Sequence, residues 1–192
     1  MKLPIYIYGM PVLREVAQDV ELNKEELDPL VKDMFETMAA ANGVGLAGPQ
    51  IGKAIRVVVI DLDVISDDLP EYKGFRRAFF NAHVVETDGE METMDEGCLS
   101  LPGINEGVKR AKKVHVTYYD EDFQFHDEWV EGFLARVMQH EFDHLEGHMF
   151  IDHLSALRKQ MIRSKLNAFL KGKVHNPHNR AHYALSKSLR RH

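Results

Sequence analysis

A pair of histidines on a predicted helix is the strongest chemical signal in this chain of 192 residues. His140 and His144 are four residues apart, so a helix would place both imidazoles on one face, where they can bind one metal ion. Glu141 follows the first histidine closely enough to accept a proton from a water molecule that the metal activates. Phe133 and Val137 continue the histidine face as an apolar stripe, which predicts that the pair is buried. The segment therefore predicts a metal-binding helix.

A catalytic metal usually has three protein ligands and an open position, so a third ligand must be found. Thermolysin-like peptidases use a downstream glutamate, but no glutamate follows Glu146, and metzincins use a histidine where this chain has Phe150. The only cysteine, Cys98, is the remaining candidate. A single cysteine also fits a buried apolar role, or a nucleophile that is paired with a histidine. However, Gly97 before it and the turn Pro102–Gly103 after it favour a backbone that presents the thiol, and a Cys-His-His set favours zinc or ferrous iron.

The segment Gly43–Gln50 contains a formal dinucleotide-binding pattern, with glycines at positions 43, 45 and 48. That pattern must follow a strand, whereas a predicted helix precedes it here, so we reject a nucleotide site. A purely structural turn remains an alternative for this segment. We expect instead that the glycines let a substrate backbone approach closely, with Gln50 offering an amide donor.

The elements that must position these residues predict one α+β domain. Asn23 and Glu26 have capping-box spacing and open a predicted helix, which we expect Gly43 to end. Ser155 is the predicted N-cap of a last helix that runs to about Leu170. The expected β-strands are residues 55–62, 78–86, 114–120 and 123–130.

Composition and charge exclude several classes of protein. The 44% hydrophobic and 28% charged residues are ordinary for a globular protein. One cysteine excludes an internal disulfide framework, and no apolar run is long enough to span a membrane. We therefore expect a cytoplasmic protein with no membrane or DNA partner. The net charge of −6 is uneven, because residues 172–192 hold five Lys and Arg residues and no acid. This basic tail indicates either RNA as a partner or a solvated segment.

In their order and spacing, the segments Gly43–Gln50, Glu96–Ser100 and Gln139–His144 resemble the three signature motifs of the bacterial-type peptide deformylases. The resemblance implies a compact α+β domain over residues 1–171, with antiparallel sheets around a central metal-binding helix and a C-terminal helix. Residues 172–192 would form a basic C-terminal tail. The implied activity is hydrolysis of the N-formyl group from the N-terminal formylmethionine of nascent proteins, with release of formate.

The same resemblance implies a role for each matching residue. Glu141 would act as general base and then general acid, and the Gln50 side chain and the Leu99 N–H would stabilise charge on the formyl oxygen. Glu96 and Arg110 would support the metal ligands from behind. The expected ligands of one ferrous ion per chain, which zinc or nickel can replace, are Cys98, His140 and His144. The residues expected to contact the substrate are Val44, Gly45, Gly97, Phe133 and Val137.

Three rival interpretations stay open at this point: a metallopeptidase, a non-enzymatic domain with a structural metal, and an inactive deformylase relative that binds ribosomes. The missing downstream ligands argue against the first, and the single cysteine argues against the second. The retained ligand set and Glu141 argue against the third. The partners expected from the resemblance are N-formylmethionyl peptides and, transiently, the ribosome through the C-terminal helix or the basic tail. One departure from the family is Gly48, where alanine is usual.

Overall fold

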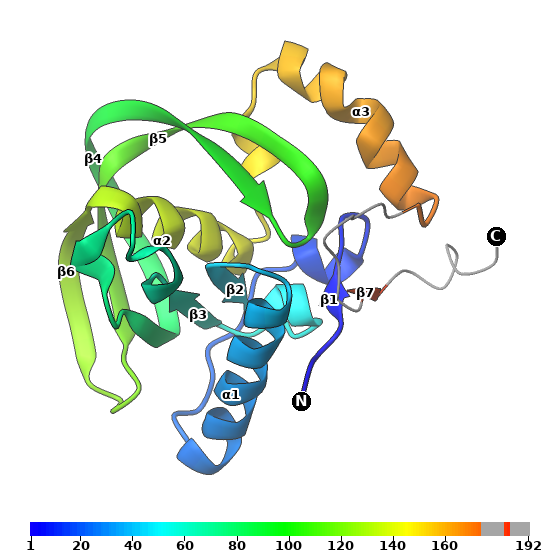
Figure 1. Cartoon of the computed structure of the whole chain (residues 1–192). Helices are drawn as coiled ribbons and strands as arrows, with labels where there is room; N and C mark the ends of the chain where they lie inside the picture. The colour runs from blue at the N-terminus through cyan, green and yellow to red at the C-terminus, as the bar shows by residue number, and fades with distance from the viewer. Residues whose placement is uncertain (174–182, 185–192) are drawn as a thin grey trace.

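The computed structural model describes residues 1–173 and 183–184, and it has one helix at its centre with an antiparallel sheet against it (Figure 1). The helices are α1 (Lys24–Ala40), α2 (Gly132–Leu145) and α3 (Ala156–Leu170). The strands of the five-stranded sheet, in spatial order, are β2 (Gly45–Ala47), β3 (Val57–Asp61), β4 (Arg76–Cys98), β5 (Leu101–Tyr119) and β6 (Phe125–Glu131). The predicted α+β class, with antiparallel strands around a central helix, is confirmed.

Strands β4 and β5 form one long curled hairpin that arches over α2 (Figure 1). Both are much longer than the predicted strands 78–86 and 114–120, so those predictions were wrong in extent. The added residues of β4 are mostly exposed and polar, and they lack the apolar alternation by which a strand is recognised. They are held instead by backbone pairing with β5, as in the pair Glu92 and Arg110. The turn was predicted at Pro102–Gly103, but these residues lie within β5; the tip of the hairpin is at Leu99 and Ser100, where Cys98 pairs with Leu101.

Helix α1 begins at the predicted N-cap, since the Asn23 side chain accepts a hydrogen bond from the Glu25 N–H at 2.9 Å. The prediction that Gly43 ends the helix was wrong in detail. The left-handed residue is Asn42, with φ 57°, and Gly43 follows it. The Gly43 N–H then donates to the Met38 carbonyl at 3.0 Å, which closes the helix as a Schellman motif. Asparagine can take this conformation because its short polar side chain tolerates left-handed geometry.

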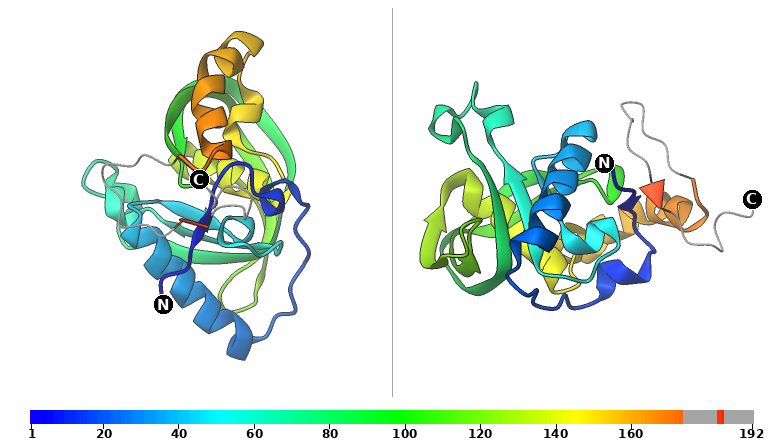
Figure 2. Two further views of the ribbon diagram at one scale, coloured as in Figure 1. Left: turned by 90° about the vertical axis from the view of Figure 1, so that its right-hand side faces the viewer. Right: turned by 90° about the horizontal axis from the view of Figure 1, so that it is seen from below.

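Helix α3 begins and ends as predicted. The Ser155 hydroxyl is its N-cap and accepts from the Arg158 N–H at 3.3 Å, and the helix ends at Leu170. Helices α1 and α3 lie at opposite ends of the molecule, with α2 and the sheet between them (Figure 2). Only Ile162 and Phe169 of α3 are buried, so most of this helix faces solvent.

The buried apolar side chains form three clusters, and one of them holds α2 in place. One lies between α2 and the sheet, one joins the first half of β5 to α3, and one packs α1 on β2 and β3. Helix α2 is unusual in carrying buried polar side chains along with its apolar ones. These are Arg136, Gln139, His140, Glu141 and His144. Because buried polar groups need partners, α2 must present its chemistry to other groups inside the molecule.

The N-terminal strand β1 (Ile5–Tyr6) pairs in parallel with β7 (Tyr183–Ala184). Of the predicted basic tail, residues 172–192, the structure describes only 172–173 and 183–184. The rest of the tail lies outside the described residues. Among the described helices, none combines the length and apolarity needed to cross a bilayer.

Candidate active site

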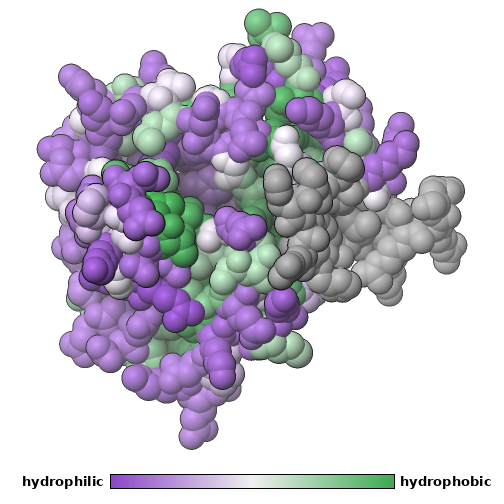
Figure 3. Space-filling model, viewed as in Figure 1, coloured by the Kyte–Doolittle hydropathy of each residue, from purple (hydrophilic) through white to green (hydrophobic). Residues whose placement is uncertain are grey.

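A cavity of about 360 Å³ lies where the start of β2, the tip of the β4–β5 hairpin and α2 meet. The corresponding face of the molecule is hollowed over α2, with apolar residues along one edge of the hollow (Figure 3). The structure brings most of the predicted site residues to this cavity. Those that line it are Val44, Gly45, Gly97, Cys98, Leu99, Phe133, Val137, His140 and Glu141. The other two, Gln50 and His144, are buried beside it.

The three predicted metal ligands converge from two elements. Cys98 comes from the hairpin tip, and His140 and His144 come from successive turns of α2. Their ligand atoms all lie within 4.8 Å of one another, and the Cys98 Sγ is 3.3 Å from the His144 Nε2. A thiolate and two imidazoles at this spacing suit a soft or borderline divalent cation with one position left open. The residues present therefore fit a catalytic metal.

The protonation of His144 agrees with a ligand role. Burial, together with the positive charge of nearby His140, lowers the pKa of His144 to about 3. The ring is therefore neutral near pH 7, and a neutral imidazole is the form that binds a metal.

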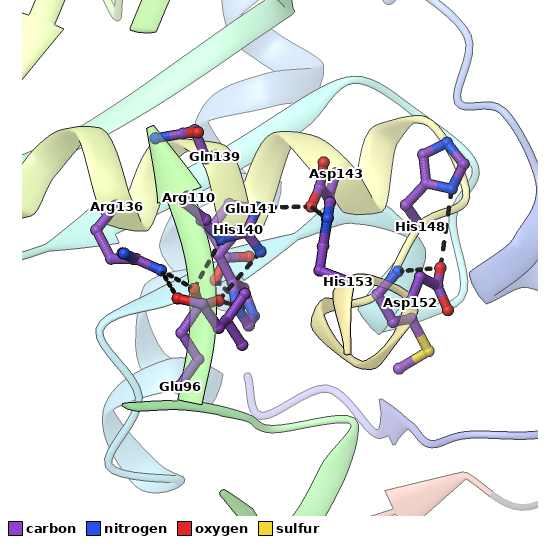
Figure 4. A network of polar contacts seen from close by, with 12 residues as sticks. Glu96, Arg110, Arg136, Gln139, His140, Glu141, Asp143, His148, Asp152 and His153 are labelled. Carbon is purple, nitrogen blue, oxygen red and sulfur yellow. Dashed lines mark hydrogen bonds and ion pairs between the residues drawn. The ribbon is translucent and has the colours of Figure 1, made fainter. Parts of the chain in front are cut away.

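Glu96 supports His140 from behind (Figure 4). The His140 Nδ1 lies 2.7 Å from the Glu96 Oε1, which directs Nε2 of the same ring toward the cavity. Arg110 donates from Nε to the Glu96 Oε2 at 2.7 Å. Burial by itself raises the pKa of Glu96, but the hydrogen bonds from His140 and Arg110 outweigh it and lower the pKa to about 2. Glu96 is thus a permanent acceptor, and Arg110, the other residue expected to support the ligands, is bonded to it.

Sequence reasoning missed a second arginine on the same carboxylate and a continuation of the network. Arg136, one turn before His140, donates from Nη1 to the Glu96 Oε2 at 2.7 Å. On the other side, Asp143 accepts from Arg110 at 2.9 Å and lies 2.8 Å from the His153 Nε2. A signal for Arg136 was available, because a charged residue four before a buried histidine must lie on the same helix face.

Glu141 is buried beside the cavity without a partner for one of its oxygens. Its Oε1 lies 3.9 Å from the His140 Nε2, and its Oε2 has no hydrogen bond within the described part of the chain. Burial raises the pKa of Glu141 to about 7, although the charge of His140 opposes the rise. Gly45 makes this position possible, because a Cβ on Gly45 would lie 2.6 Å from the Glu141 Oε1.

Gln50 links the glycine-rich segment to the hairpin tip. It lies in the 3-10 turn Gly48–Ile51, and its Oε1 accepts from the Ala47 N–H at 2.9 Å. Its Nε2 donates to the Cys98 Sγ at 3.4 Å and to the Ser100 Oγ at 3.2 Å. The amide is therefore next to the ligand set, but it does not line the cavity.

Two further glycines bring segments into close contact. A Cβ on Gly43 would lie 2.7 Å from the Leu99 side chain, so glycine allows the segment Gly43–Gln50 to approach the tip of the β4–β5 hairpin. A Cβ on Gly48 would lie 2.4 Å from the Ile55 carbonyl oxygen. The departure from alanine at Gly48 therefore coincides with a loop that has no room for a side chain.

The polypeptide deformylase family model matches residues 2–160, which include the whole ligand set and every residue that lines the cavity. The chain belongs to the polypeptide deformylase family. A curated peptide deformylase from Flavobacterium johnsoniae is 45% identical over 91% of this chain and 92% of its own length. One from Cytophaga hutchinsonii is 42% identical over 90% and 92%.

Solved structures agree with the family. The crystal structure of a peptide deformylase from Legionella pneumophila has a TM-score of 0.77 and 38% identity, covering 91% of this chain and all of that one. The peptide deformylase from Thermus thermophilus has a TM-score of 0.78 and 38% identity over 90% of this chain. Deformylases are metalloenzymes that hydrolyse the formyl group from N-formylmethionyl nascent peptides, and this chain is a hydrolase of that kind.

Proposed function

We propose that this chain carries out deformylation with one ferrous ion held by Cys98, His140 and His144. The observation that carries the proposal is the convergence of one thiol and two imidazoles beside a buried, unpartnered carboxylate oxygen of Glu141. When bound there, a divalent cation acts as a Lewis acid and makes an adjacent water molecule acidic near neutral pH.

Glu141 is the proton carrier of the proposed reaction. Its Oε2 accepts a proton from the attacking water and later delivers that proton to the leaving nitrogen. The C–N bond of the formamide breaks, the water oxygen stays on carbon, and the products are formate and a free amine. The buried setting of Glu141 supports this role, because little solvent competes for its proton.

Two groups are proposed to stabilise negative charge on the formyl oxygen. The Gln50 Nε2 lies 3.4 Å from the Cys98 Sγ, so its N–H is adjacent to the ligand set, and Leu99 lines the cavity. Preorganised donors of this kind act strongly because they need no reorganisation during the reaction.

The substrate groove is proposed to bind an extended peptide between two backbone edges. Val44 and Gly45 form one edge, Gly97 forms the other, and both line the cavity. The methionine side chain would enter the apolar slot made by Phe133 and Val137, which continue the histidine face of α2. A flexible thioether suits an irregular apolar slot of this kind.

Formate release from a formyl-Met-Ala peptide tests the proposal. Protein reconstituted anaerobically with ferrous iron should release formate, and Cys98→Ala should abolish the release. Repeating the assay with zinc and nickel identifies the working metal, since a thiolate and two imidazoles suit all three. A folded, metal-loaded wild-type protein that releases no formate would refute the proposed reaction.

Ribosome docking is the second proposed interaction, and the charge of α3 supports it. Between residues 154 and 173 the chain has six basic residues and no acid. They are Arg158, Lys159, Arg163, Lys165, Lys171 and Lys173. Such a surface attracts RNA phosphates in a salt-dependent way. We further propose that residues 1–171 form the catalytic domain and that the protein works in the cytoplasm, where nascent substrates emerge.

A further inference from the structure

We propose that Arg136 is a positioning residue that holds His140 in its ligand orientation by fixing Glu96. This inference rests on the proposed ligand set and adds a residue whose hydrogen bonds go to Glu96, Val108 and Glu92 and not to a ligand atom. Arg136 lies on α2 one turn before His140, and its guanidinium is directed to Glu96 (Figure 4).

The guanidinium of Arg136 binds three acceptors on the β4–β5 hairpin. Its Nη1 donates to the Glu96 Oε2 and to the Val108 carbonyl, both at 2.7 Å, and its Nη2 donates to the Glu92 carbonyl at 2.8 Å. The side chain is only 7% exposed. Arg136 therefore ties the metal-binding helix to both strands of the hairpin whose tip carries Cys98.

The geometry of Glu96 gives these contacts a consequence for the metal site. One carboxylate oxygen, Oε1, meets the His140 Nδ1 and also accepts from the Arg110 Nη2 at 3.1 Å. The other oxygen, Oε2, accepts from the Arg136 Nη1 and the Arg110 Nε. A carboxylate bound at both oxygens by Arg110, and at Oε2 also by Arg136, cannot rotate freely about its terminal bond. The direction of the hydrogen bond to His140 is thereby fixed, and with it the direction of the opposite ring nitrogen.

An arginine is required because the three acceptors are spread around one planar group. A guanidinium offers several N–H donors in a rigid fork, whereas the ammonium of a lysine is a single point with a shorter reach. Arg136→Lys should therefore keep the positive charge while losing at least one strand contact. Arg136→Met should keep much of the volume while losing all three hydrogen bonds.

A simpler alternative is that Arg136 only forms part of the wall of the substrate cavity, which it lines. The two roles predict different losses. A wall residue would alter KM for formyl-Met peptides and leave metal retention unchanged. A positioning residue would lower kcat, speed up metal loss, and change the environment of the metal.

The decisive measurement uses protein loaded with Co²⁺, whose visible absorption depends on ligand geometry. The rate of Co²⁺ transfer to a chelator is followed for the wild type, Arg136→Lys and Arg136→Met. Supporting groups behind metal ligands are typically worth about 10- to 100-fold in metal affinity or activity. We expect release to accelerate about 10- to 100-fold in Arg136→Met, with a shifted Co²⁺ spectrum, and to a smaller extent in Arg136→Lys. In the iron-loaded enzyme, kcat should fall while KM changes little.

Arg158→Met is the matched control. Arg158 also reaches a glutamate of β5, with its Nε 2.9 Å from the Glu106 Oε2, but its side chain bonds only Glu106 and the Met161 Sδ within the described residues and not Glu96 or a ligand. This variant should lose stability without a change in metal release or spectrum. If it accelerates release as much as Arg136→Met does, the effect is general loosening and the proposal fails.

A double variant tests whether Arg136 acts through Glu96. In a Glu96→Gln background, adding Arg136→Met should change metal release much less than it does in the wild type, because the shared pathway is already lost. Equal, additive effects would overturn the proposal. If Arg136→Met releases metal at the wild-type rate, the positioning role of Arg136 is refuted and the proposed deformylation is unaffected. If the wild-type protein neither holds metal nor releases formate, both the positioning role and the proposed deformylation are refuted.

Discussion

Glu141 illustrates how burial prepares a single side chain for chemistry. One of its oxygens has no hydrogen bond within the described residues, and buried polar atoms in that condition are rare enough to need an explanation. The proposed proton transfer to and from the substrate would supply that explanation. Glu141→Ala should reduce formate release by at least about 100-fold, which is the usual contribution of a general base. Metal content measured on the same sample should equal that of the wild type, because Glu141 is not a ligand, and an active variant would overturn the assigned role.

Gly45 contributes by having no side chain. A Cβ at this position would lie only 2.6 Å from the Glu141 Oε1, so Gly45→Ala should displace the carboxylate. Small displacements of catalytic groups cost a large part of the rate, so kcat should fall by about 10-fold or more. Metal retention should persist. Gly107→Ala is the control, because the nearest neighbour of a Cβ there is the exposed Thr93 side chain at 3.1 Å and not Glu141. Equal kcat values for Gly45→Ala and the wild type would show that Glu141 tolerates the displacement.

At the scale of elements, strands β5 and β6 bring a titratable histidine, His115, into contact with a tryptophan and an aspartate. His115 stacks on Trp129, with ring centroids 5.1 Å apart, and also contacts Asp127. The hydrogen bond to Asp127 raises the pKa of His115 above its ordinary value, against an opposing effect of burial and with a smaller contribution from Glu86.

The stacking of His115 on Trp129 predicts a pH-dependent fluorescence signal. Trp129 is the only tryptophan, and a protonated imidazole stacked on it quenches its emission. Emission should therefore stay low until the pH rises through the raised pKa of His115, and then increase. Asp127→Asn should move the midpoint to lower pH, and His115→Gln should remove the transition. A midpoint that does not move in Asp127→Asn would contradict the assigned cause.

The β4–β5 hairpin shows how an element can escape prediction. Residues between Glu86 and Asp95 on β4 are exposed apart from the half-buried Met94 and carry no apolar alternation, so their local sequence does not specify a strand. Pairing with β5 specifies it instead. Helix α3 is the opposite case, because the Ser155 cap and the following helix formers act within a few residues of one another and the prediction was correct at both ends.

At the scale of the whole molecule, an ion pair joins segments far apart in sequence. Arg14, in the turn Pro11–Arg14, donates to the Asp152 Oδ2 at 2.7 Å, in the turn Phe150–His153. Burial by itself raises the pKa of Asp152, but the hydrogen bonds from Arg14 and from the Met149 N–H outweigh it and hold the pKa below its ordinary value.

A depressed carboxylate pKa predicts a specific pH dependence of stability. The stabilisation is fully present above the unfolded-state pKa of about 3.9 and is lost as pH falls through the lower, folded-state pKa. Asp152→Asn should therefore unfold more easily than the wild type near pH 7, by less than about 1 kcal/mol because the pair is partly exposed. The difference in free energy of unfolding, measured by urea titration at several pH values, should shrink below about pH 4. A difference that is independent of pH would exclude the ion pair as its origin.

The basic tail is tested on the scale of the assembled particle. If it helps docking, deletion of residues 173–192 should weaken co-sedimentation with ribosomes, most clearly at moderate salt, because phosphate contacts are salt-dependent. Hydrolysis of a short formyl peptide should be unchanged, because the residues that line the cavity all precede the deletion. Unchanged co-sedimentation would contradict a docking role for these residues.

The sequence by itself determined the parts of this protein that are local or carried by motifs. The spacing of His140 and His144 predicts one helical face, the caps Asn23 and Ser155 predict where helices begin, and the elimination of other ligands leads to Cys98. Three motifs in their order predicted the family. Each of these inferences needs only neighbours along the chain, or a motif whose order is preserved.

Only the tertiary structure decided which side chains from distant parts of the sequence contact the same group. Glu96 meets Arg110, Arg136 and His140 because the long hairpin folds back over α2, and no local pattern specifies that approach. The absence of room at Gly45 and Gly48 likewise depends on what packs against them. Side-chain partners across a fold are set by packing geometry, and packing depends on the whole chain at once, so the contact of Arg136 with Glu96 and the exact contacts around the predicted ligands came only from the folded molecule.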